Sequence, residues 1–156
     1  MKIDQLMLSV ITSLLVVCAA SAKEPAKVEF LSSANARAAG LPFSEAVRVD
    51  NTLYLSGQVG TKPGTRELVP GGMQEEAKQV MTNIKTTLEA HGYSLRDLVK
   101  CTVMLADMSK WGDFNEIYKS FFDGRYPARS AMGVNGLALG AQVEVECIAV
   151  ANAGKS

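Results

Sequence analysis

Two segments near the end of the chain carry residue types that could act together on a small acid. The segment "RYPARSAMGV", residues 125–134, places Arg129 at the mouth of an expected strand. A guanidinium there offers a fixed fork of donors that matches a carboxylate. The segment "QVEVECIAV", residues 142–150, adds Glu144, a carboxylate that can handle a proton or a water molecule. These residues predict a small-acid binding site, and the alternative is that Arg129 is an ordinary surface arginine.

The alternation within residues 142–150 indicates where the carboxylates point. Successive side chains of a strand lie on opposite faces of the sheet, so one parity of this segment is wholly apolar. The other parity holds Glu144, Glu146, Ile148 and Val150. Two carboxylates therefore share a face with two apolar side chains.

Periodicity predicts the elements that position these residues. Short strand-like runs are bounded by turn residues, and a loop rich in Gly and Pro, residues 61–72, follows the first hairpin. Two other segments repeat apolar residues at helical spacing, the first stopped by Gly92 and the second capped by Ser109. The expected strands are residues 27–33, 44–60 with a turn at Asp50-Asn51, 98–106, 128–134 and 142–150; the helical stripes are Met73, Ala77, Val80, Met81, Ile84 and Leu88, then Trp111, Phe114, Ile117, Tyr118 and Phe121.

The resulting order, β-β-β-α-β-α-β-β, leaves one face of the sheet without helices. Two helices can cover only one face, so the other is bare in a monomer. Large mixed apolar patches of this kind mark an interface, which predicts an oligomer. The bare face is expected to carry Lys100, Thr102, Met104, Glu144, Glu146, Ile148 and Val150.

Composition and single residues exclude several classes of function. The 156 residues carry a formal net charge of zero, which favours neither nucleic acid nor an anionic membrane surface as a partner. With His91 as the single histidine, a hydrolase triad is hard to assemble, and "SGQVG" at residues 56–60 lacks the lysine of a phosphate loop. Cys101 and Cys147 are interpreted as buried small residues in preference to a disulfide. The sequence has no cluster of cysteine and histidine residues, so a structural zinc site is not expected.

The beginning of the chain predicts export. Residues 1–22 contain an apolar run followed by Ala20-Ser21-Ala22, the pattern of a cleaved signal peptide. The mature domain, residues 23–156, is then periplasmic or secreted and has no stable membrane anchor. The alternatives are an uncleaved anchor and a lipoprotein attached through Cys18.

Four segments together resemble the RidA/YjgF family of enamine and imine deaminases over nearly all of residues 28–150. They are "LYLSGQVG", "VKCTVMLADMSKWGDFNEIYKSFF", "YPARSAMGV" and "VEVECIAV". The resemblance implies an α+β, chorismate-mutase-like (bacillary) fold, a mixed β-sheet with two helices packed on one face. It also implies a homotrimer whose sheets line a central barrel, with three clefts between subunits. The implied reaction is hydrolysis of 2-enamine and 2-imino acids, such as 2-iminopropanoate and 2-iminobutanoate, to 2-oxo acids and ammonia, with no metal or organic cofactor.

The resemblance also implies roles for individual residues. Arg129 matches the arginine that binds the substrate carboxylate, and Glu144 matches the glutamate that positions the attacking water or moves its proton. Glu146 is then a structural partner, with Lys100 on the same face as a candidate. The implied substrate-binding residues are Phe43, Ser56, Gly57, Asn115 and Ala131.

Two of these residues depart from the family pattern, and they keep other functions open. Phe43 stands where the deaminases have a tyrosine, so a hydroxyl is missing. Ala131 replaces a frequent cysteine but keeps the backbone N–H. The absent hydroxyl and the predicted export motivate the alternative of a non-catalytic small-carboxylate-binding or chaperone-like trimer. A nuclease role, ascribed to some relatives of the family, fits poorly with zero net charge and no basic stripe.

Overall fold

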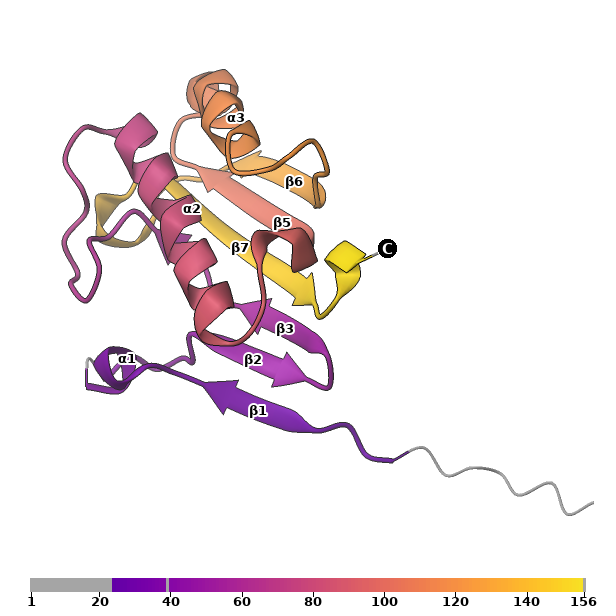
Figure 1. The fold of residues 1–156 in the computed structure, drawn as a ribbon. Coiled ribbons are helices and arrows are strands. Elements are labelled where there is room, and N and C mark those ends of the chain that lie inside the picture. Colours follow the sequence, from indigo (N-terminus) through magenta and orange to yellow (C-terminus); the bar gives the residue numbers. More distant parts are fainter. Residues whose placement is uncertain (1–23, 39, 156) are drawn as a thin grey trace, which may run out of the picture.

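A computed structural model of the chain describes residues 24–38 and 40–155, so the predicted signal peptide lies outside the described residues. One mixed sheet runs in the order β1-β2-β3-β7-β5-β6, and the short β4 also pairs with β7 (Figure 1). Neighbouring strands are antiparallel except β5 and β6, which are parallel. The strands are β1 (Val28–Leu31), β2 (Ala46–Val49), β3 (Thr52–Leu55), β4 (Gln58–Val59), β5 (Leu98–Leu105), β6 (Ala128–Gly133) and β7 (Val143–Val150).

Two helices cover one face of this sheet. In Figure 1, α2 (Met73–Ala90) lies alongside β7 and α3 (Trp111–Lys119) lies beside β6, both on the same side. The expected α+β fold, a mixed sheet with two helices on one face, is therefore confirmed. A short helix, α1 (Ala34–Ala38), was not expected, and 3-10 turns occur at Leu95–Asp97, Met108–Lys110, Ala138–Gly140 and Ala153–Lys155. Within the described ranges, no helix has both the length and the apolar character needed to cross a membrane.

The central strand β7 has the burial pattern that its sequence predicts. Val143, Val145, Cys147 and Ala149 are buried in the core on the side where α2 packs, while the intervening residues are partly or fully exposed. One parity of β7 thus faces the helices and the other faces away. The core also includes the buried stripe of α2, namely Met73, Ala77, Val80, Met81, Ile84 and Leu88.

The predicted end of α2 is confirmed, whereas the predicted start of α3 is wrong. Gly92 adopts a φ of 81°, and the next residue, Tyr93, donates its N–H to Leu88 O at 2.9 Å. Before α3, the side chain of Asp107 accepts the Ser109 N–H at 2.9 Å, so Asp107 caps the 3-10 turn Met108–Lys110. The 3-10 turn that follows delays α3 to Trp111, whose side chain is exposed although the sequence assigned it to the apolar stripe.

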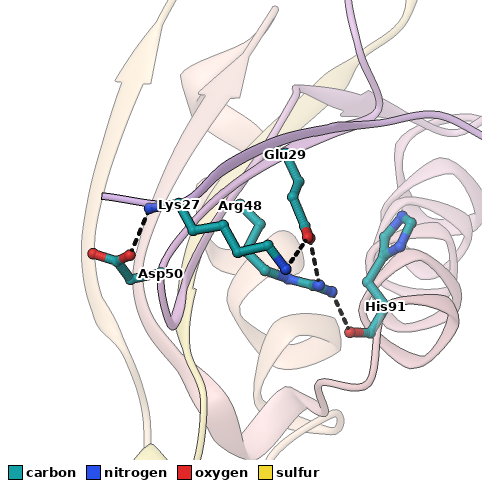
Figure 2. A network of polar contacts seen from close by, with 5 residues as sticks. All are labelled: Lys27, Glu29, Arg48, Asp50 and His91. Carbon is teal, nitrogen blue, oxygen red and sulfur yellow. Dashed lines mark hydrogen bonds and ion pairs between the residues drawn. The ribbon is translucent and has the colours of Figure 1, made fainter. Parts of the chain in front are cut away.

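A polar network fastens the edge strand β1 to β2 and to the end of α2 (Figure 2). Arg48 donates to Glu29 at 2.8 Å and to the backbone carbonyl of His91 at 2.9 Å. Lys27 also pairs with Glu29, at 2.7 Å, while its N–H donates to Asp50. The hydrogen bond and charge of Lys27, with those of Arg48, lower the pKa of Glu29. His91 therefore enters the network through its main chain.

The two cysteines form a disulfide, so their interpretation as free buried residues is wrong. Cys101 in β5 and Cys147 in β7 are direct partners in the antiparallel register, with Cα atoms 4.1 Å apart. Register, which a single strand pattern does not reveal, brings the two sulfur atoms together.

Candidate active site

The sheet face away from the helices is a mixed surface, as the strand pattern predicts. Register partners share a face, so the pairing of strands defines a row of side chains that crosses five strands. At one end of that row Phe30 is 76% exposed, and at its middle Tyr54 is 47% exposed. The row consists of Phe30, Val47, Tyr54, Ile148 and Lys100. We call this side of the sheet the open face.

Arg129 lies on the opposite, helix-covered face. It is the register partner of Cys101, whose side chain is buried in the core under the helices. Its guanidinium donates to Asn115 Oδ1 at 2.6 Å and lies over the ring of Tyr118, with Cζ 4.7 Å from the ring centroid. Among the described residues, Asn115 is the one hydrogen-bond partner of this guanidinium, which leaves further N–H donors for a ligand. Ala131 follows Arg129 on the same face of β6.

Glu144 lies on the open face, against the main chain of Gly57. A Cβ at Gly57 would be 2.0 Å from Glu144 Oε1, so only glycine leaves room for this carboxylate. Partial burial, and then the neighbouring charge of Glu146, raise the pKa of Glu144 above its ordinary value. Ser56 donates its hydroxyl to Ser44 O at 2.7 Å, which ties the end of β3 to the loop that carries Phe43.

One protomer therefore does not bring Arg129 and Glu144 together. Arg129 is in register with Cys101, and Glu144 is in register with Met104 on the same strand, β5. Positions three apart on a strand point to opposite faces, so the two predicted catalytic residues are on opposite sides of the sheet. The predicted residues form two groups: Arg129, Asn115 and Ala131 on the helix side, and Glu144, Gly57 and Ser56, next to the Phe43 loop, on the other.

The structure does not show the expected pairing of Glu146 with Lys100 among the described residues. Lys100 Nζ donates to Ser130 Oγ at 2.8 Å, and Glu146 is in register with Thr102. A shallow hollow of about 120 Å³ lies between Tyr54, Lys100 and Glu146 on the open face. It is smaller than typical ligand pockets, which enclose roughly 300 Å³ or more.

Two residues beside Arg129 were missed as site residues by the sequence analysis. Phe114 and Tyr118 were assigned to the apolar stripe of α3, and both are indeed buried. Their rings also lie under the Arg129 guanidinium, with Cζ 5.7 Å from the Phe114 centroid. For Tyr118 the available signal was its spacing from Asn115, because residues three apart on a helix are neighbours, whereas the position of Phe114 directly before Asn115 gave no such signal.

Known relatives include deaminases. A mouse protein named 2-iminobutanoate/2-iminopropanoate deaminase is 51% identical over 120 residues, which cover 77% of this chain and 89% of the relative. A human protein with the same name is 44% identical over 120 residues, with coverage of 77% and 88%. These relatives align with the bulk of the chain.

The relatives correct the predicted localisation. The expectation of a periplasmic or secreted protein is wrong, because the matching mammalian deaminases are intracellular. The comparisons also give no support to the signal peptide predicted from residues 1–22. The apolar run in these residues, taken alone, was an insufficient basis for assigning a compartment.

A solved structure supports the fold, and a family model identifies the family. The crystal structure of RidA from the Antarctic bacterium Psychrobacter sp. PAMC 21119 superimposes with a TM-score of 0.69 at 40% identity, covering 78% of this chain and 94% of that one. The profile of the family described as "Endoribonuclease L-PSP" matches residues 33–151. Because the match spans most of the chain and includes both groups of candidate site residues, the chain belongs to the YjgF/RidA family, described as endoribonuclease L-PSP.

Proposed function

We propose that this protein is an enamine/imine deaminase that hydrolyses 2-enamine and 2-imino acids to 2-oxo acids and ammonia. The observation that carries the proposal is the Arg129 guanidinium, oriented by Asn115 with donors available for a carboxylate. The names of the mouse and human relatives, 2-iminobutanoate/2-iminopropanoate deaminase, support the reaction. The proposed substrates are therefore short imino acids such as 2-iminopropanoate and 2-iminobutanoate.

The site forms between subunits of a homotrimer in this proposal. Arg129 and Glu144 lie on opposite faces of one sheet, so a cleft that uses both takes Arg129 from one subunit and Glu144 from its neighbour. The exposed Phe30 and Tyr54 support burial of the open face against another copy. Membership of the RidA family, whose proteins are commonly trimers, also supports this assembly.

The proposed reaction needs only positioning and one proton-transfer group. Arg129 binds the substrate carboxylate and fixes C2 of the imine. Glu144 takes a proton from water as the water oxygen bonds to C2 and the C=N π electrons move to nitrogen. The proton on Glu144 then passes to nitrogen, which gives a carbinolamine with a C2 hydroxyl and an amino group. The hydroxyl proton next moves to the amino group, the C–N bond breaks, and ammonia leaves as C2–O becomes the carbonyl. The products are a 2-oxo acid and ammonia.

The environment of Glu144 suits this role. Burial and the charge of Glu146 raise its pKa, which makes the ionised carboxylate a stronger base than an exposed glutamate. Gly57 leaves the space that the carboxylate occupies. Because the Ser56 hydroxyl already donates to Ser44 O, it can offer a ligand only its acceptor lone pairs. Phe43 contributes an apolar wall, and Ala131 its backbone N–H.

The first test measures hydrolysis with three variants. An amino-acid oxidase generates 2-iminopropanoate, and semicarbazide traps what the protein has not hydrolysed. Wild type is expected to suppress semicarbazone formation, whereas Arg129→Ala and Glu144→Gln are not. Arg125→Ala is the matched control, because Arg125 is an exposed arginine close in sequence that donates to a backbone carbonyl. Undiminished hydrolysis by Arg129→Ala would refute the proposed role of the guanidinium.

Mixing two inactive variants tests the location of the site. Subunits of Arg129→Ala and Glu144→Gln are unfolded together in equal amounts and refolded. If the cleft combines two subunits, about one cleft in four contains both intact residues, and activity returns. If both residues act within one subunit, every site carries a lesion and the mixture stays inactive.

A binder without catalysis is the second candidate, and Phe43 is the observation that favours it. The exposed phenyl ring offers a small acid an apolar surface but no hydroxyl. Calorimetric binding of 2-oxobutanoate, together with no acceleration of imine hydrolysis, would support this function over deamination.

A further inference from the structure

A column of aromatic rings runs along α3 and beyond it, and Arg129 lies on that column. The ring centroids of Phe114 and Tyr118 are 5.6 Å apart, and Tyr118 is 4.8 Å from Phe122. Tyr118 is the ring nearest to Arg129, with 4.7 Å between the guanidinium carbon and the ring centroid. Only 3% of Tyr118 is exposed, so the packing of the core fixes this ring.

The two shortest contacts of the guanidinium restrain it in different directions. The hydrogen bond from Arg129 Nη2 to Asn115 Oδ1 fixes one edge of the planar group. The face of the Tyr118 ring attracts the cation and limits rotation out of plane. A single hydrogen bond would leave the group free to turn about it, whereas an edge contact and a face contact together define one orientation.

The hydroxyl of Tyr118 takes no part in these contacts. It is buried, and it has no hydrogen-bond partner among the described residues. Burial raises the pKa of Tyr118 to about 12, so the phenol stays neutral and does not cancel the charge of Arg129. The ring face is therefore the part of Tyr118 that serves Arg129.

We infer that Tyr118 is a positioning residue, whose ring face holds the Arg129 guanidinium in the orientation that binds the carboxylate of the substrate. This inference rests on the proposed function of Arg129, and it adds a residue that the sequence assigned to the core alone. It predicts that substrate affinity depends on an aromatic ring at position 118 and is insensitive to the hydroxyl.

Three variants separate the ring, the hydroxyl and simple packing. Tyr118→Phe keeps the ring, and its KM for 2-iminobutanoate should stay within about twofold of wild type. Tyr118→Leu removes the ring face and should raise KM by about tenfold, with a smaller change in kcat. Phe122→Leu is the matched control: it removes the neighbouring ring of the column, which contacts Tyr118 but not Arg129. This variant should lower the melting temperature and leave KM unchanged.

The opposite pattern overturns the inference. If Tyr118→Phe raises KM as much as Tyr118→Leu, or if Phe122→Leu raises KM equally, the aromatic face has no specific role. Tyr118→Met provides a second ring-free variant should Tyr118→Leu fail to fold, because methionine adapts to irregular space in a core. The KM expected for it is that of Tyr118→Leu.

A binding titration separates this inference from the proposed reaction. Each variant is titrated with 2-oxobutanoate by calorimetry, which reports carboxylate binding without any chemical step. Wild type that binds 2-oxobutanoate but does not hydrolyse imines would refute deamination, and the Tyr118 variants would still show whether the ring supports binding. Wild type that hydrolyses imines, with equal affinities for Tyr118→Phe and Tyr118→Leu, would refute only the positioning role.

Discussion

Glu144 places its carboxylate in the space that Gly57 leaves open. A Cβ at Gly57 would lie 2.0 Å from Oε1 and 2.9 Å from Cδ of Glu144. Atoms cannot approach so closely, so the carboxylate position requires glycine at this point of the chain. The glycine of the "SG" pair, Gly57, is thus required for steric reasons, which its position near a strand end did not reveal.

Gly57→Ala is expected to displace Glu144 and lower kcat/KM by about 100-fold, because a shift of about 1 Å in a reacting group has effects of that size. Steady-state hydrolysis of 2-iminobutanoate measures this. Gly112→Ala is the control, since a Cβ at Gly112 in α3 meets no atom within 4 Å. It should leave activity unchanged and, as a glycine replaced within a helix, stabilise the fold by up to about 1 kcal/mol. Full activity in Gly57→Ala would show that Glu144 need not lie where it does.

The acid limb of the pH–activity profile should report Glu144. Its ionised form is the active one, and its raised pKa moves the loss of activity to a higher pH than an ordinary glutamate would give. Glu146→Gln removes one cause of the shift, so its limb should move to lower pH. Glu116→Gln, which removes an exposed charge from α3, should not move the limb. An unmoved limb in Glu146→Gln would show that the limb belongs to another group.

The same shift has a defined effect on stability. A raised pKa in the folded state means that the folded protein binds the proton of Glu144 more tightly than the unfolded chain does. The stabilisation from this proton is complete below the unfolded pKa and is lost as pH rises through the folded pKa. Glu144→Gln, a neutral isostere, should therefore be more stable relative to wild type at about pH 7 than at about pH 4, which denaturant titration at both pH values can measure.

Asn115 should be more sensitive to added charge than to loss of its side chain. Asn115→Ala removes the acceptor 2.6 Å from Arg129 and should raise KM by about tenfold. Asn115→Asp keeps an acceptor but places an anion beside the guanidinium, where it competes with the substrate carboxylate, so KM should rise by about 100-fold. Asn135→Asp, in an exposed loop, is the charge control. A lower KM for Asn115→Asp than for Asn115→Ala would contradict this order.

Reduction of the Cys101–Cys147 disulfide should weaken the fold. The bond closes a loop with a sequence separation of 46, for which the loss of chain entropy in the unfolded state corresponds to about 4 kcal/mol at most. Guanidinium chloride unfolding with and without a phosphine reductant, at one protein concentration, measures the difference. The double variant Cys101→Ala/Cys147→Ala should not respond to reductant. Equal midpoints for reduced and oxidised wild type would mean that the bond adds no stability.

Local patterns predicted the elements of the fold, and tertiary register explains what they missed. The α2 stripe and the stop at Gly92 are encoded within one helix, and both are correct. The start of α3 was predicted wrongly because Asp107, and not Ser109, is a cap, and the element that Asp107 caps is a 3-10 turn that precedes the helix. The disulfide was not predicted because it depends on the register between β5 and β7, two strands that are far apart in the sequence.

The candidate site shows the same division. Family motifs identified Arg129, Asn115 and Glu144, and strand parity indicated that Glu144 is on the bare face. The alternation within one strand does not show how β6 and β7 are aligned with β5 between them. That alignment places Arg129 on the other side of the sheet from Glu144. Tyr118 was correctly predicted as a core residue, but an apolar stripe carries no information about a cation lying on one of its rings.

Arg129 lies on an edge strand, β6, which should unfold locally more often than the central strands. This strand is the last of the sheet, paired only with β5 among the described residues, and the chain reaches it through the crossover that contains α3 (Figure 1). Edge segments open at a lower free energy than central strands, and each opening of β6 would separate Arg129 from Asn115. A ligand that binds only the closed form must suppress that opening in proportion to its occupancy. Amide hydrogen exchange of β6 would therefore slow as the carboxylate site fills, and the exchange rate would measure how much of the site is occupied.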